Sequence, residues 1–88
     1  MDLDEQVGDY LEQAEECLVA DDNKAEFYLL KFLELNTNTK KRSKAYLRLG
    51  EIYQRTKQED LSDLYYRKAL EEDPENKEAE EHLKLKNE

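Results

Sequence analysis

The sequence predicts an all-α protein, and three observations support this fold class. Apolar residues recur every three or four positions through most of the 88 residues, which is the spacing of one face of an α-helix. Two glycines and one proline are too few for the many tight turns of an all-β fold. Hydrophobic residues make up 38% of the chain and charged residues 42%, so we expect a few amphipathic helices with solvated outer faces.

The first two expected helices cover residues 4–20 and 22–36, separated by the turn-forming stretch ADDN. Spacings of four, three and four place one apolar face on the first helix, at Val7, Leu11, Ala14 and Leu18. Asp22 or Asn23 is expected to cap the second helix. Its apolar positions are Ala25, Tyr28, Leu29, Phe32, Leu33 and Leu35.

Three further helices are expected after the connector NTNTKKR, whose Asn and Thr side chains favour turns and caps. The third covers residues 43–56, KQED forms the next turn, and the fourth covers residues 61–72. Pro74 ends the fourth helix, because the residue before a proline is disfavoured in the helical conformation. A fifth, mostly polar helix follows at residues 76–86.

The third and fourth helices carry a spaced pattern of small and aromatic residues. It reads Tyr46-x2-Leu49-Gly50-x2-Tyr53, then Ser62-x3-Tyr66-x2-Ala69-x4-Pro74. This pattern resembles the tetratricopeptide repeat (TPR) family, whose signature is W-x2-L-G-x2-Y followed by A-x3-F, A and P. The resemblance covers residues 43–76, with mild exchanges of Tyr for Trp and Phe and of Ser for Ala. It implies that Gly50 lets the partner helix approach closely and that the tyrosines fill the space between helices.

The resemblance also implies a domain organisation. Residues 4–37 are expected to form a first repeat, residues 43–76 a second, and residues 77–88 a capping helix, all within one small domain of residues 1–88. Each repeat is expected to be an antiparallel helix-turn-helix unit. The first repeat departs from the family pattern, because Glu15 stands where glycine is expected and Thr37 where proline is.

No residue set has the spacing of a catalytic, metal or cofactor site, so we do not expect an enzyme. His82, the only histidine, lies in a highly charged segment and is expected to be solvated, and Cys17 is expected to be structural. A net charge of −9 disfavours nucleic acid as a partner. No run approaches the ~20 apolar residues of a membrane span. One cysteine and no signal peptide favour a cytoplasmic location.

Four polar residues of the third helix share one face, at spacings of four, three and four: Lys44, Arg48, Glu51 and Arg55. In the TPR family this face lines a concave groove, and some members hold the C-terminal carboxylates of chaperone peptides there. The resemblance places Lys44 and Arg48 where these co-chaperone-like members have the lysine and arginine that hold the carboxylate. The same spacing on the first helix gives residues that would repel a carboxylate: Asp9, Glu12, Gln13 and Glu16.

The expected site is therefore a groove with one basic and one acidic side, which suits a protein segment carrying both charge signs. The expected function is a non-enzymatic protein–protein interaction module that binds a peptide or helical segment of a partner protein. A solvated charged face without a ligand is an open alternative. Another is a structural role, in which the large apolar residues of the second helix drive homodimer formation or stacking in a longer helical array.

Overall fold

The structure is a computed structural model that describes residues 10, 14, 16 and 21–86. These residues form α2 (Asp22–Leu35), α3 (Thr39–Arg55), α4 (Glu59–Glu72) and α5 (Lys77–Lys86). They contain no strand, so the predicted all-α class is confirmed. Most of the first expected helix, residues 4–20, lies outside the described residues.

The chain divides into two compact units, residues 1–37 and residues 38–88. The expected single domain of residues 1–88 stays a prediction. Unit 1 contributes α2, and unit 2 contributes α3, α4 and α5. Among the described residues, no helix is both long enough and apolar enough to cross a bilayer.

The cap of α2 is Asp21 and not Asp22 or Asn23 as expected. Its carboxylate accepts hydrogen bonds from the backbone N–H groups of Asn23 and Lys24, at 3.1 and 3.2 Å. Asp21 has the extended backbone conformation of a cap residue, with φ −153° and ψ 98°. Both acidic residues of ADDN have suitable side chains, so residue type alone did not distinguish the cap from its neighbour.

Helix α3 begins four residues before the expected start at residue 43. Asn38 caps it, because its side-chain oxygen accepts from the backbone N–H of Lys41 at 3.1 Å. The expected connector therefore ends at Asn38, and its last four residues, Thr39–Arg42, form the first turn of α3. The turn preference of Asn and Thr was given too much weight in the prediction, since one Asn in this stretch suffices as a cap.

The turn between α3 and α4 is shorter than the predicted KQED. Lys57 has φ 62°, the left-handed conformation that glycine usually adopts after a helix. The N–H of Gln58 bonds the carbonyl of Tyr53 at 2.8 Å, and the N–H of Lys57 bonds that of Gln54 at 3.2 Å. These two bonds form a Schellman motif. Glu59 and Asp60 already belong to α4, where acidic side chains complement the helix dipole.

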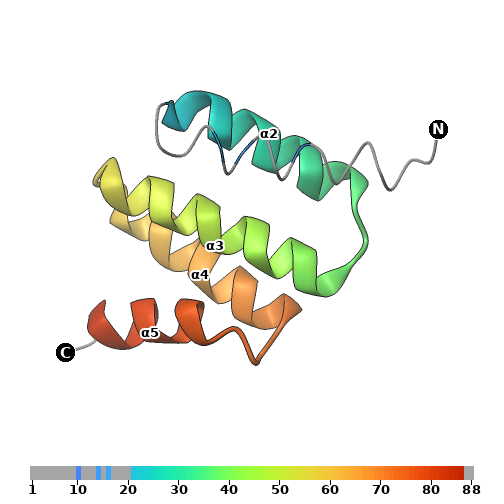
Figure 1. Ribbon diagram of the computed structural model, residues 1–88. Coiled ribbons are helices and arrows are strands. Elements are labelled where there is room, and N and C mark those ends of the chain that lie inside the picture. The colour runs from blue at the N-terminus through green and yellow to red at the C-terminus, as the bar shows by residue number, and fades with distance from the viewer. Residues whose placement is uncertain (1–9, 11–13, 15, 17–20, 87–88) are drawn as a thin grey trace. The chain divides into compact units, whose positions relative to one another are not determined.

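Within unit 2, α3 and α4 run antiparallel and side by side, and α5 turns back along α4 (Figure 1). A Cβ atom placed on Gly50 would lie 2.7 Å from two ring carbons of Tyr66, closer than real Cβ contacts allow. The Tyr66 side chain is fully buried. The expected close approach of the two helices at Gly50 is therefore confirmed.

Helix α5 completes a small core with one face, while most of its described side chains are exposed. Ala79 is fully buried with Leu47, Tyr66 and Ala69, and Leu83 packs against this cluster. The His82 ring lies parallel to the Tyr66 ring, with centroids 4.5 Å apart and 5° between the planes. His82 was expected to be a solvated side chain. This expectation was wrong, because the stacking on Tyr66 makes it partly buried.

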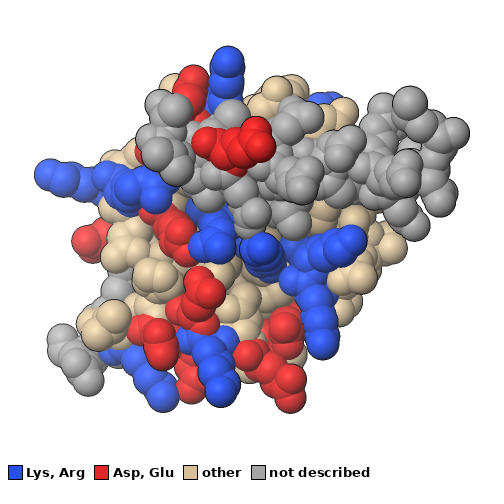
Figure 2. All heavy atoms as spheres, viewed as in Figure 1, with Lys and Arg blue, Asp and Glu red and all other residues tan. Residues whose placement is uncertain are grey.

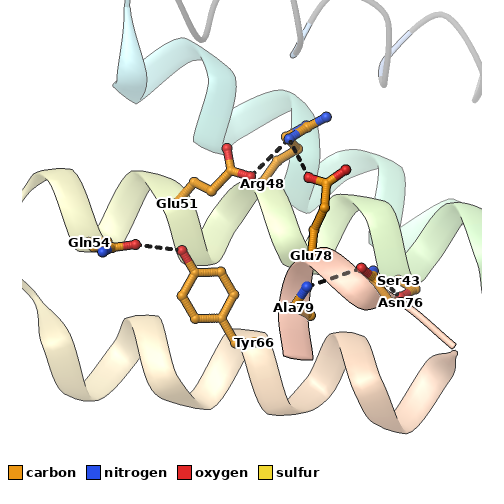
Figure 3. Close-up of polar contacts among 8 residues, drawn as sticks. All are labelled: Ser43, Arg48, Glu51, Gln54, Tyr66, Asn76, Glu78 and Ala79. Carbon is orange, nitrogen blue, oxygen red and sulfur yellow. Dashed lines mark hydrogen bonds and ion pairs between the residues drawn. The ribbon is translucent and has the colours of Figure 1, made fainter. Parts of the chain in front are cut away.

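A polar network joins the start of α3 to the end of α4 and the start of α5 (Figure 3). The buried Ser43 hydroxyl donates to the carbonyl of Ala69 at 2.7 Å and accepts from the Asn76 side-chain amide at 2.8 Å. The Asn76 side-chain oxygen accepts from the backbone N–H of Ala79 at 3.2 Å, as a helix cap does. This network fixes how the three helices of unit 2 meet.

Candidate functional site

The outer face of α3 carries most of the residues predicted to bind a partner. Lys44, Arg48, Glu51 and Arg55 all lie on this helix, and their spacing places them on one face. Because α3 begins at Thr39, Lys40 joins the same face one turn before Lys44. We call Lys40, Lys44, Arg48 and Arg55 the basic stripe, which extends over about 23 Å at 1.5 Å per residue.

The basic stripe stands out in a chain with a net charge of −9. Figure 2 shows Lys and Arg side chains gathered where α3 lies in Figure 1, above all toward its N-terminal end. Below them, over α5, acidic and basic side chains alternate. Lys40, Lys44 and Arg55 are exposed, whereas Arg48 is partly buried.

Arg48 lies between two carboxylates of its own chain (Figure 3). Its Nη1 atom lies 2.9 Å from a carboxylate oxygen of Glu51 on the same helix and 3.8 Å from one of Glu78 on α5. The Glu78 side chain is 64% exposed. Because exposed ion pairs stabilise by only about 0–1 kcal/mol, a carboxylate from a partner protein could take the place of Glu78 at Arg48.

Sequence reasoning missed two members of this surface. Lys40 was assigned to a connector, although its spacing of four from Lys44 already pointed to the same helix face. Glu78 was assigned to a solvated terminal helix. No local pattern relates it to Arg48, since the two residues meet only because α5 packs on α4.

The acidic side of the expected groove is a different case. Asp9, Glu12 and Gln13 lie outside the described residues. Glu16 is described and exposed, but it belongs to unit 1, whereas the basic stripe belongs to unit 2. The two belong to different units, and the acidic side of the groove stays a prediction.

Aromatic and cationic side chains hold α3 and α4 together beside the stripe. The Tyr65 ring of α4 lies 5.9 Å from Tyr46 and 5.3 Å from Tyr53, centroid to centroid. Arg42 lies over the Tyr46 ring at 5.6 Å and bonds Glu72 of α4, Nε to Oε1, at 3.2 Å. Aromatic pairs, cation–π contacts and a partly buried ion pair together fix the orientation of α3.

Among the titratable groups of unit 2, the buried Tyr66 has a structural role. The Tyr66 hydroxyl donates to the side-chain oxygen of Gln54 at 2.8 Å. Burial of the phenol raises the pKa of Tyr66 to about 12, so this group stays protonated at neutral pH. In the part of the chain that the structure describes, no group of three or more His, Cys, Asp or Glu side chains could hold a metal ion.

Comparison with known protein families matched a tetratricopeptide repeat to residues 43–76. This range is the predicted one, so the resemblance is confirmed for the second repeat. The tetratricopeptide repeat is generally a protein–protein interaction module and typically non-catalytic, and no enzyme family matched. Neither the comparison with curated proteins nor the comparison with solved structures gave a match.

Proposed function

Starting from the tetratricopeptide repeat at residues 43–76, we propose that this chain is a non-enzymatic module that binds a peptide or helical segment of a partner protein. The binding surface is the outer face of α3. The observation that carries the proposal is the basic stripe, four cations on one helix face of a chain with a net charge of −9. In this proposal, residues 4–37 form a degenerate first repeat and residues 77–88 form the cap.

The stripe and its neighbours favour a partner with a mixed charge pattern. Carboxylates of the partner segment would lie along Lys40, Lys44 and Arg48, where arginine can hold a carboxylate through two parallel hydrogen bonds. Basic groups of the partner would lie near Glu51 and Glu78. Such complementarity selects a partner by rejecting segments that place like charges together.

The test is a pull-down from cell extract with the wild-type chain, Arg48→Glu and Arg67→Glu. Arg67 is exposed on α4, so its reversal changes the net charge equally without touching the stripe. We expect a partner that Arg48→Glu loses and Arg67→Glu retains, with circular dichroism showing equal helix content. Retention of every partner by Arg48→Glu would refute binding at the stripe.

A second candidate function is assembly through α2. It is favoured by three large apolar side chains that are exposed on this one helix, Phe27, Leu30 and Leu35. For the location of the protein we propose the cytoplasm. The single cysteine supports this location, because one cysteine forms no intramolecular disulfide and disulfides are rare in reducing compartments.

A further inference from the structure

Helix α2 has apolar residues on two opposite sides. Its buried side carries Ala25, Leu29 and Phe32, all with no exposed area. Outside this buried side, Phe27 is 55% exposed, Leu30 43% and Leu35 44%. Single exposed apolar side chains are common, but several on one helix indicate a surface that another molecule covers.

The charges within this surface are self-complementary. Lys31 and Glu34 form an ion pair of 3.8 Å, Nζ to Oε2, and their side chains are 45% and 67% exposed. They lie between Leu30 and Leu35, so the order is leucine, cation, anion, leucine. If two copies of α2 run antiparallel about a two-fold axis, Leu30 of each copy lies at the same level along the helix axis as Leu35 of the other, one at each edge of the contact. Lys31 of each copy then faces Glu34 of the other, with both contacts made twice.

We propose that the outer face of α2 binds the same face of a second copy of this chain, antiparallel about a two-fold axis between Phe32 and Leu33. This inference rests on the second candidate function and names its partner. It is independent of the basic stripe, which lies on α3 of the other unit. An isologous contact of this kind closes on itself and yields a dimer, not an open array.

The area of the outer face of α2 limits how stable the dimer can be. One helix face with three large apolar side chains buries less than the roughly 800 Å² per partner of a standard interface. Two copies, each with a charge of −9, also repel one another at long range. The dimer is therefore weak and forms at high protein concentration. Higher salt screens the overall repulsion over a Debye length of about 8 Å at 0.15 M, so dimers should form more readily at 0.15 M than at 0.01 M salt.

The test is sedimentation of the full chain over a dilution series, with a reductant present so that Cys17 forms no intermolecular disulfide. Leu30→Gln should abolish the dimer. Leu64→Gln is the matched control, since Leu64 is 46% exposed on α4 and should leave the dimer unchanged. Circular dichroism should show equal helix content in all variants.

Charge reversal then tests the arrangement of the two copies. Lys31→Glu or Glu34→Lys alone replaces two attractive contacts by two repulsive ones, and we expect about tenfold weaker dimerisation, because exposed ion pairs are individually weak. The double variant Lys31→Glu/Glu34→Lys restores both contacts. It should dimerise like the wild type.

These measurements distinguish pairing through α2 from the antiparallel arrangement of the two copies. A wild-type chain that stays monomeric at every concentration would overturn pairing through α2 and leave the proposal for α3 standing. A dimer that depends on Leu30 but is not restored by the double variant would overturn the antiparallel arrangement alone. A dimer lost in Leu64→Gln and kept in Leu30→Gln would move the contact away from α2.

Discussion

Helices α2 and α3 both have a fully buried stripe, but their outer faces differ in chemistry. The buried residues are alike, small or apolar in both helices, such as Ala25 and Leu29 in α2 and Ala45 and Leu49 in α3. The outer face of α2 exposes Phe27, Leu30 and Leu35. The outer face of α3 carries the basic stripe.

This difference shows that the fold constrains the inner face of each helix but not the chemistry of its outer face. Both inner faces follow one rule, because a helix in a small domain must bury an apolar side. The outer faces are not constrained in this way, so their chemistry is free to match partners. The comparison predicts that substitutions at inner positions change the stability of the fold. Substitutions at outer positions change association instead.

The largest effect is expected at Gly50, on the inner face of α3. Gly50→Leu places a side chain where Tyr66 already lies, and overpacking of this kind costs about 1–3 kcal/mol. Lys44→Leu adds the same side chain to the outer face and should change stability by less than about 0.5 kcal/mol. Urea unfolding measures both. Equal stability of the wild type and Gly50→Leu would contradict the packing described for α3 and α4.

Two buried serines should respond to the same substitution in opposite directions. Ser43→Ala removes a buried hydroxyl that makes two hydrogen bonds, each contributing about 0.5–1.5 kcal/mol, so we expect a loss of about 1–3 kcal/mol. The Ser62 hydroxyl is buried beside the Tyr66 phenol, but it makes no hydrogen bond of good geometry among the residues described. Ser62→Ala should therefore stabilise the protein by up to about 1 kcal/mol. Thermal unfolding of both variants checks the signs, and a destabilised Ser62→Ala would refute this account of α4.

Tyr66→Phe tests the hydrogen bond and the burial of the same ring. At neutral pH the variant loses the bond to Gln54, and we expect a loss of about 0.5–1.5 kcal/mol in the free energy of unfolding. Denaturant unfolding at pH 7 measures it.

The alkaline pH dependence gives a second measurement on Tyr66. Its pKa is about 12 in the folded protein, above the ordinary tyrosine value of 10.0, so at a pH between these two values the unfolded state loses the proton first. The Tyr66 contribution is complete below pH 10 and falls as the pH rises toward 12. The stability difference between wild type and Tyr66→Phe should shrink over this range, and a constant difference would argue against a buried phenol.

The smallest stability effects are expected on the two outer faces. Leu30→Gln on α2 and Lys44→Gln on α3 should each change the unfolding free energy of the dilute monomer by less than about 0.5 kcal/mol. Unfolding at low protein concentration measures this. A large loss from Leu30→Gln in the monomer would mean that its side chain supports the fold, and the comparison between α2 and α3 would fail.

Much of unit 2 was predictable from the sequence, because its constraints are local and repeated. The resemblance to a known repeat placed Gly50 where the partner helix comes close and Tyr66 in the space between the helices, which is where the structure has them. The matched family range, residues 43–76, is the predicted one for the same reason.

The errors arose where local preference and packing compete. The start of α3 was misplaced because Asn and Thr favour both turns and caps, and only the fold decides between them. His82 was expected in solvent because its neighbours are charged, but α5 turns it toward Tyr66. The ion pair between Arg48 and Glu78 depends on how α5 docks, which no spacing in the sequence encodes.

The hydrogen bond between Asn76 and Ser43 affects how further copies of the repeat can be added to this chain. It joins the two ends of the matched segment, so the backbone enters and leaves this block of sequence at one place. A block with adjoining ends can be copied or excised without stretching the chain on either side. A duplicate of residues 43–76 inserted directly after Asn76 would begin with a new serine beside the old exit, ready to make the same bond with its own final asparagine.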